Sequence, residues 1–265
     1  MASLDAGSGD SRARARGDGP SRLVLEGSAR RWNEAIGRLW ARILERNRLD
    51  REGTVVEVGP GFADKIGRGL AQLRFAGTLL VVEPCAAPRD WVVESYRSLL
   101  PRAKIVPLAG DIGTVRDLPE RAEGLFMNHV IDDLMLGAAL PPGRASALFS
   151  EMVPGGPCSP DLRLAWRRLG DDRRLLEATS RRVVRELCAL VSAIRPRLVV
   201  MSHYASWYQR THGLETADRL AQSVLVQLRD RLGGTTPGNR RLLARLRQDP
   251  GRWFVSDRDW RSATS

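Results

Sequence analysis

Residues 54–64 read TVVEVGPGFAD, and this stretch indicates how the rest of the chain folds. Four of the five residues 54–58 are apolar or β-branched, and the run stops at Gly59-Pro60-Gly61, which predicts a buried strand entering a tight turn. Glycine at 59 and 61 allows a positive φ or the close approach of a ligand, and the helical pattern behind the turn would offer free N–H groups. Glu57 is unusual in such a strand, because a buried carboxylate is unfavourable unless a nearby group needs it.

The rest of the chain alternates strand and helix patterns. Apolar strands are predicted at 78–84, 104–108, 124–134 and 197–204, and a last short strand at 252–257. Helices are predicted at 63–73, 88–100, 114–121, 160–169, 172–194, 215–232 and 239–247. This alternation is typical of βαβ units, and right-handed crossovers place the carboxyl ends of the strands on one rim. The expected class is therefore α/β, with a mostly parallel sheet flanked by helices.

The N-terminal part divides into a tail and a helix. Residues 1–20 have almost nothing to bury, which predicts disorder. A helix over about 28–48 carries Trp32 and Trp40 on one apolar face, so it either covers the sheet or acts as a lid over a pocket. The expected organisation is a helical extension over 21–50 and a main domain over 51–265, with a helical insertion at about 137–175 before the fifth strand.

Composition and charge narrow the classes of function. No apolar run reaches the roughly 18 residues of a membrane span, the N-terminus has no hydrophobic segment, and three cysteines lack metal-like spacing, so we expect a cytoplasmic protein with no membrane partner. The net charge of +11 raises nucleic acid as a partner. Nearly all the cations are arginines dispersed among acids, which indicates GC-rich coding bias instead. Nucleic acid is therefore disfavoured but stays open.

Three acids lie at or just beyond successive strand ends. They are Glu57, Glu83 and Asp111, and Glu83 follows Gly61 at about the spacing with which dinucleotide-type folds place an acid against ribose hydroxyls. A carboxylate can accept two hydrogen bonds from a vicinal diol, and Asp111 could accept from an exocyclic amine. Each feature alone is also compatible with an ordinary turn or a solvated strand end. Together they predict a nucleoside site.

Three motifs then resemble a known family. VVEVGPG, LLVVEP and LAGDI resemble the first three motifs of the class I S-adenosylmethionine-dependent methyltransferases, over residues 54–134. The resemblance implies a Rossmann-like fold, with S-adenosyl-L-methionine as cofactor and its methionine part above Gly59 and Gly61. It also implies that Glu57 serves the amino group and Glu83 the ribose, while Asp111 meets the adenine amine.

The same resemblance has further implications and two departures. Ile112 would pack on the adenine ring. Phe62 and Ala63 replace the third glycine of a dinucleotide fingerprint, which suits a cofactor without pyrophosphate and disfavours a nicotinamide dehydrogenase. The first departure from the family is Ala63 near the place of its usual third glycine, which predicts a less open turn. The second is that the family has two strands after the fifth, whereas this sequence offers one convincing candidate, at 252–257, and the other is either lost or hidden in a predicted helix.

The rim at 128–133 is where the methyl acceptor reacts in this family. His129 is a candidate general base, with an ordinary pKa near 6.5. Asp132, counted with the catalytic residues, and Asp133, counted with the acceptor-binding ones, could bind a cation of the acceptor or a metal, although both also suit the N-terminus of a helix. Asn128, counted with the cofactor-binding residues, resembles the first position of the N-P-P-Y tetrad of base-amine methyltransferases. The other three positions differ, which argues against base-amine methylation.

The fifth predicted strand ends in a polar and aromatic group on the same rim. His203 is a second candidate base, although a single histidine at a strand end is more often structural. Tyr204, Trp207 and Tyr208 could form the wall of an acceptor pocket, or could equally pack under the 215–232 helix.

The sequence therefore predicts a methyltransferase for a small-molecule acceptor that works mainly by positioning, with no metal. One alternative keeps the cofactor but transfers or cyclises its aminocarboxypropyl arm, as nicotianamine-synthase-like enzymes do. Another is a nucleic-acid methyltransferase. A homodimer stays open.

Overall fold

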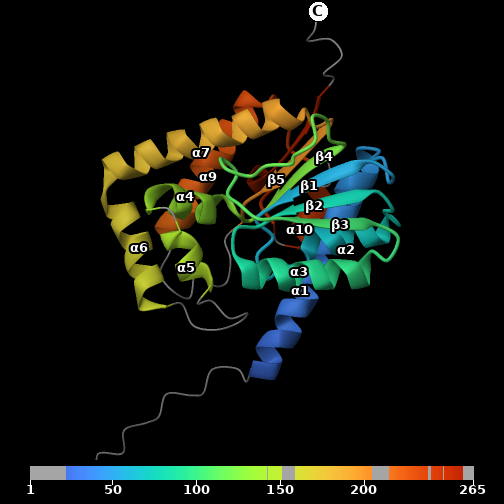
Figure 1. Ribbon diagram of the computed structural model, residues 1–265, viewed down its shortest axis with the longest axis horizontal. Helices are drawn as coiled ribbons and strands as arrows, with labels where there is room; N and C mark the ends of the chain where they lie inside the picture. The colour runs from blue at the N-terminus through green and yellow to red at the C-terminus, as the bar shows by residue number, and fades with distance from the viewer. Residues whose placement is uncertain are drawn as a thin grey trace, which may run out of the picture.

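The computed structural model describes residues 22–141, 143–150, 159–204, 215–237, 240–246 and 248–258. Its centre is one six-stranded sheet in the order β3-β2-β1-β4-β5-β6 (Figure 1). The strands are β1 (Thr54–Val58), β2 (Thr78–Val82), β3 (Lys104–Leu108), β4 (Gly124–Asn128), β5 (Leu198–Ser202) and β6 (Trp253–Asp257). The first five are parallel and β6 is antiparallel to β5. This arrangement confirms the expected Rossmann-like α/β class.

Helices cover both faces of the sheet. One face carries α1 (Arg22–Arg46), α2 (Lys65–Gln72), α3 (Ala86–Leu99) and α10 (Arg240–Arg245). The other carries α4 (Ile131–Ala139), α5 (Arg144–Ser150), α6 (Pro160–Asp171), α7 (Arg173–Ile194) and α9 (Glu215–Arg231). A 3-10 turn, η1 (Pro250–Arg252), leads into β6. The expected helical insertion before the fifth strand contains α5 and α6.

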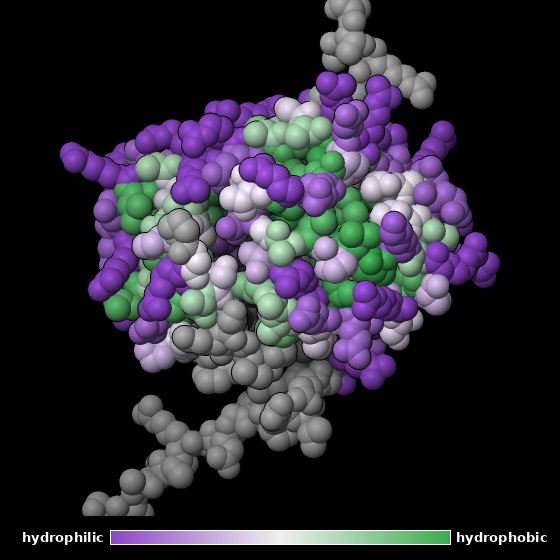
Figure 2. Space-filling view, in the orientation of Figure 1, coloured by the Kyte–Doolittle hydropathy of each residue, from purple (hydrophilic) through white to green (hydrophobic). Residues whose placement is uncertain are grey.

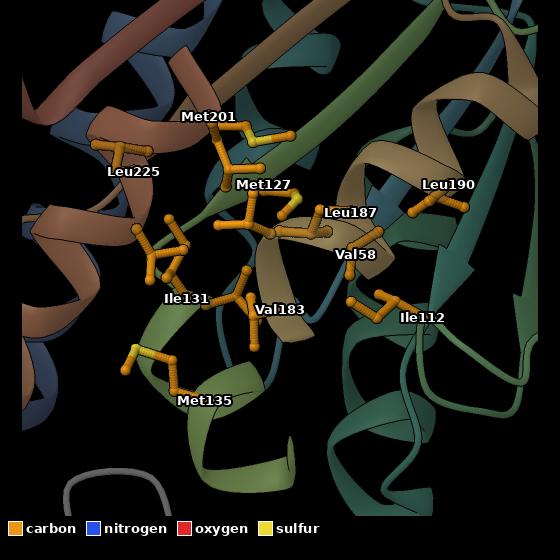
Figure 3. Close-up of a cluster of buried hydrophobic side chains, with 14 of the residues drawn as sticks. Val58, Ile112, Met127, Ile131, Met135, Val183, Leu187, Leu190, Met201 and Leu225 are labelled. Carbon is orange, nitrogen blue, oxygen red and sulfur yellow. The ribbon is translucent and has the colours of Figure 1, made fainter. Parts of the chain in front are cut away.

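The larger core lies between the sheet and α4, α7 and α9. Figure 3 shows Val58, Met127 and Met201 on three adjacent strands pointing at Val183 and Leu187 of α7. All five side chains are at most 2% exposed. Burying one such side chain stabilises the fold by about 1.5–3 kcal/mol, so this layer fixes the strand ends that carry the polar rim.

Helix α1 is part of the second core and not a loose extension. The Trp40 indole is fully buried, with its ring centroid 5.7 Å from Phe126 of β4 and 5.6 Å from Trp253 of β6. Gly37 of α1 and Gly69 of α2 let the two helices approach closely, since a Cβ at either position would crowd the other helix. Helix α1 therefore covers the sheet, as the first of the two sequence interpretations proposed.

Three sequence predictions need correction. The fourth strand ends at Asn128, not 134, because His129 takes a left-handed φ of 58° and Ile131 begins α4 with Asp132 and Asp133 in its first turn. Residues 114–121 form turns and bends instead of a helix. Helix α1 begins by Arg22, so Ser28 lies inside the helix and not at its cap.

The candidate strand at 252–257 is present as β6, which forms the edge of the sheet and is the one strand that follows β5 within the described ranges. The predicted disorder of residues 1–20 lies outside those ranges. None of the described helices combines the length and apolar character that crossing a membrane requires. Figure 2 shows hydrophilic residues around most of the visible face, with hydrophobic residues gathered in its middle.

Candidate active site

The glycine turn connects β1 to α2 at the rim. Gly59 and Gly61 both have positive φ, 60° and 58°, so the expected turn is present. The Gly59 N–H donates to the Val82 carbonyl at 2.8 Å, and a Cβ on Gly59 would overlap the Val130 side chain. A Cβ on Gly61 would instead meet nothing within 4 Å. The turn is thus packed tightly on one side and open at Gly61.

Glu83, at the end of β2, is joined to this turn. Its Oε2 accepts from the Gly61 N–H at 3.1 Å and its Oε1 from the Cys85 N–H at 3.0 Å. The side chain is 5% exposed, and burial raises the pKa of its carboxyl, partly offset by these two backbone donors. The carboxylate therefore connects the glycine turn to the start of α3, and its remaining lone pairs can accept from a ligand.

Glu57 points to the face covered by α1, α2 and α3. It is 2% exposed, and the Tyr96 hydroxyl lies 2.8 Å and 3.0 Å from its two oxygens. Burial raises the pKa of Glu57 to about 8, with Tyr96 opposing the shift and the Asp64 and Glu83 charges adding to it. At neutral pH the group is therefore mostly a neutral carboxyl held beneath the glycine turn.

Asp64 is a functional candidate that the sequence analysis missed. It directly precedes α2, is almost completely buried, and accepts two 2.8 Å hydrogen bonds from Arg68. Ser95 of α3 and Asn33 of α1 also donate to it, at 3.2 Å and 3.4 Å. Asp64 thus holds three helices together behind the turn. The Asp64–Arg68 spacing of four residues was the available sequence signal.

The third expected acid is more open. Asp111 follows β3, and its side chain is exposed, while its backbone carbonyl accepts from Thr114 and Val115. The neighbouring Ile112 is buried in the larger core. Three adjacent strands therefore present Gly61, Glu83 and Asp111 along one rim, in the order predicted.

His129 lies at the end of β4, beside the glycine turn. Its left-handed φ is uncommon for a residue other than glycine, although histidine adopts it more often than most, and it costs about 1–3 kcal/mol. The His129 ring stacks on His203 at 4.7 Å and on Tyr204 at 5.0 Å. Burial, followed by the nearby His203, holds the pKa of His129 well below its ordinary value. The imidazole is therefore neutral at pH 7, with a lone pair on one ring nitrogen.

His203 is fully buried between two carboxylates. Its Nδ1 lies 3.9 Å from Asp132 Oδ1, and its Nε2 lies 3.5 Å from Asp218 Oδ1. Arg252 donates to both Asp218 oxygens, at 2.6 Å and 2.9 Å. Burial alone would raise the pKa of Asp218, but the nearby His203 ring and the hydrogen bonds from Arg252 outweigh it and the pKa is lowered.

Asn128 and Tyr204 point away from the open side of the rim. The Asn128 Oδ1 accepts from Trp40 Nε1 at 3.0 Å and from Ser202 at 3.2 Å, and its Nδ2 donates to the Tyr204 hydroxyl at 3.1 Å. Tyr204 also packs edge-on against Trp32, 5.7 Å away. These groups attach α1 to the ends of β4 and β5.

The remaining expected residues are less closely tied to this group. Asp133 is exposed in the first turn of α4, next to the buried Asp132. Trp207 and Tyr208 lie outside the described residues. The described ranges contain no group of three or more histidine, cysteine, aspartate or glutamate side chains arranged to hold a metal ion.

The sequence matches no protein-family model and no curated protein. Solved structures with similarity include the methyltransferase domain of bacterial CtHen1-C, at 12% identity over 77% of this chain and 86% of that one, with a TM-score of 0.43. A SAM-dependent methyltransferase from Aquifex aeolicus is 12% identical over 75% and 82%, with a TM-score of 0.40.

Coclaurine N-methyltransferase, bound to N-methylheliamine and SAH, is 14% identical over 62% of this chain. The match spans 35% of that chain, with a TM-score of 0.31. All three TM-scores are below 0.5 and are too low to assign the fold by similarity. The fold assignment therefore rests on the strand order and connections of this chain.

Proposed function

We propose that this protein is an S-adenosylmethionine-dependent methyltransferase acting on a small-molecule acceptor. The main support is the hydrogen bond from the Gly61 N–H to Glu83, which joins an open glycine turn to an acid on the neighbouring strand. With Asp111 on the next strand, the rim offers carboxylates for ribose hydroxyls and for an exocyclic amine. These residues fit a nucleoside better than a pyrophosphate, since the groups at this rim are mainly acceptors.

The bound cofactor would supply a sulfonium methyl group that already reacts with nucleophiles. The chain's own contribution is positioning and proton transfer. We assign His129 as the base, because its imidazole is neutral at pH 7 and lies next to the glycine turn through the Val130–Gly59 contact. His203 is too buried to reach an acceptor directly and supports His129 instead.

The cofactor assignment is tested by calorimetric titration with S-adenosylmethionine. We expect binding by the wild-type protein, and a loss of at least about tenfold in Glu83→Ala, because a charge-assisted hydrogen bond is worth about 1.5–3 kcal/mol. Glu94→Ala is the matched control, since Glu94 is an exposed carboxylate on the following helix α3. Absence of binding to the wild type, or equal binding by a folded Glu83→Ala variant, would contradict the assignment.

Product analysis separates the proposal from its two alternatives. S-adenosylhomocysteine as product indicates methyl transfer, whereas methylthioadenosine indicates that the aminocarboxypropyl arm has moved. The exposed arginines of α6 and α7 are the feature that keeps a nucleic-acid acceptor under test. RNA or DNA binding through them would weaken steeply with salt. If the protein does not bind RNA or DNA at low salt, a nucleic-acid acceptor is excluded.

A further inference from the structure

Two residues outside the predicted site control the surroundings of His203. Asp218 belongs to α9 and Arg252 to η1, far apart in the sequence. Asp218 is only 7% exposed and presents Oδ1 to the His203 Nε2, while Arg252 binds both of its oxygens. Asp218 therefore approaches the ring nitrogen, and Arg252 from a second peripheral element holds Asp218 there.

The backbone reinforces the same contact. The backbone N–H of His203 donates to the backbone carbonyl of Arg252 at 2.9 Å, so Arg252 is connected to His203 both directly and through Asp218. Gln222 Nε2, one turn after Asp218 on α9, donates to the Gly251 carbonyl at 2.9 Å. This link fixes η1 against α9. The Asp218–Arg252 ion pair is thus held in place by both α9 and η1, unlike the exposed ion pairs on the molecular surface.

We propose that Asp218 and Arg252 are positioning residues that fix the orientation and tautomer of His203, and through the ring stack the position of His129. The proposal rests on the proposed role of His129 as the base, but the positioning itself can be measured without an acceptor. The 3.5 Å separation of His203 Nε2 and Asp218 Oδ1 is longer than a regular hydrogen bond, but an ionised carboxylate only accepts, so it favours the tautomer with the proton on the nitrogen that faces it. A fixed ring at 203 then gives His129 a rigid stacking surface.

The charged groups around His129 come from several packed elements. They are Lys65 of α2, His203 after β5, Asp218 of α9 and Arg252 of η1. The negative charge of Asp218 raises the pKa of His129, and the positive charge of Arg252 lowers it. Removing one or the other should therefore move that pKa in opposite directions.

The test is histidine NMR on the full chain, which contains only three histidines. Labelled ring nitrogens are assigned with the three single His→Asn variants. We expect the Nε2 of His203 to carry a proton in the wild type. In Asp218→Asn the arginine takes the only side-chain oxygen, so the amide NH2 faces Nε2, which must then lose its proton while Nδ1 carries one.

Arg252 provides an independent second test. In Arg252→Gln the pKa of His129 should rise by about half a unit or more, and in Asp218→Asn it should fall. Arg252→Lys, which keeps the positive charge, should restore a nearly normal pKa. Glu177→Gln is the matched control, because Glu177 pairs with Arg173 at an exposed position on α7 and should change neither signal.

A folded Asp218→Asn protein with Nε2 of His203 still protonated would overturn the proposal. So would an unchanged His129 pKa in folded Arg252→Gln, which remains informative if Asp218→Asn does not fold. Failure of S-adenosylmethionine to bind would leave these spectra as expected. The proposed function and the positioning role can therefore fail separately.

Discussion

Glu57 lies beneath the glycine turn as a neutral carboxyl, and replacing it with glutamine should remove a large pH-dependent part of the stability. Its pKa rises from 4.5 to about 8 on folding, so the folded state holds a proton that the unfolded state loses between these values. The associated stability is fully present below about pH 4.5 and is lost as the pH rises through about 8. The slope is about 1.4 kcal/mol per pH unit, and the whole shift corresponds to about 5 kcal/mol.

Urea denaturation of the wild type and Glu57→Gln from pH 5 to pH 9, followed by tryptophan fluorescence, measures this effect. Glutamine still accepts a hydrogen bond from Tyr96 but does not titrate. The variant should gain stability relative to the wild type steadily from pH 5 to pH 8 and then level off. Groups that titrate equally in both proteins cancel in the difference.

The exposed Glu94 again offers the matched control, since Glu94→Gln should show a difference that does not change over this range. A flat difference for Glu57→Gln, within about 1 kcal/mol from pH 5 to pH 9, would refute the buried neutral carboxyl. A difference that grows toward acid would refute it as well, because it would mean that the native state favours the ionised form.

Two further predictions concern packing. Gly59→Ala should destabilise the fold by more than about 2 kcal/mol, because the new methyl group overlaps Val130 and the residue has a positive φ. Gly61→Ala places its methyl group in open space and should cost only about 1 kcal/mol. Equal losses of stability for the two variants in thermal melts would contradict this. Trp40→Phe keeps most of the ring packing but leaves the Asn128 oxygen with one hydrogen-bond donor fewer. Urea denaturation should therefore show that the free energy of unfolding falls by about 1–2 kcal/mol. An unchanged midpoint would exclude a stabilising role for that hydrogen bond.

The parts of this fold that follow local patterns were predictable. A β-branched run ending in glycine, repeated strand–helix alternation and an acid at the end of the next strand all arise within one or two βαβ units. The meeting of Gly61 with Glu83 is of this kind, because neighbouring parallel strands end on the same rim. Asn128 was also readable in part. It shares a strand face with Phe126 by the period of two, and so points toward α1.

Other features depend on contacts between distant parts of the chain. The end of β4 was placed six residues too late because an apolar run can continue through a strand or start a helix, and the left-handed turn at His129 has no glycine to mark it. Asp218 and Arg252 carry no local signal, since their meeting depends on how α9 and β6 pack beside β5. Sequence patterns identify the candidate histidines but do not identify their partners.

The contact between Trp40 and Trp253 also has a consequence for how the chain is synthesised. The first described helix packs against the last strand as well as against α2 and β4, so the aromatic face of α1 cannot be completely buried until β6 has left the ribosome. Until then the side of Trp40 that meets Trp253 stays uncovered on the nascent chain, and its burial waits for one of the most distant contacts in the fold. This half of the core is therefore completed last, when β6 joins the sheet beside β5.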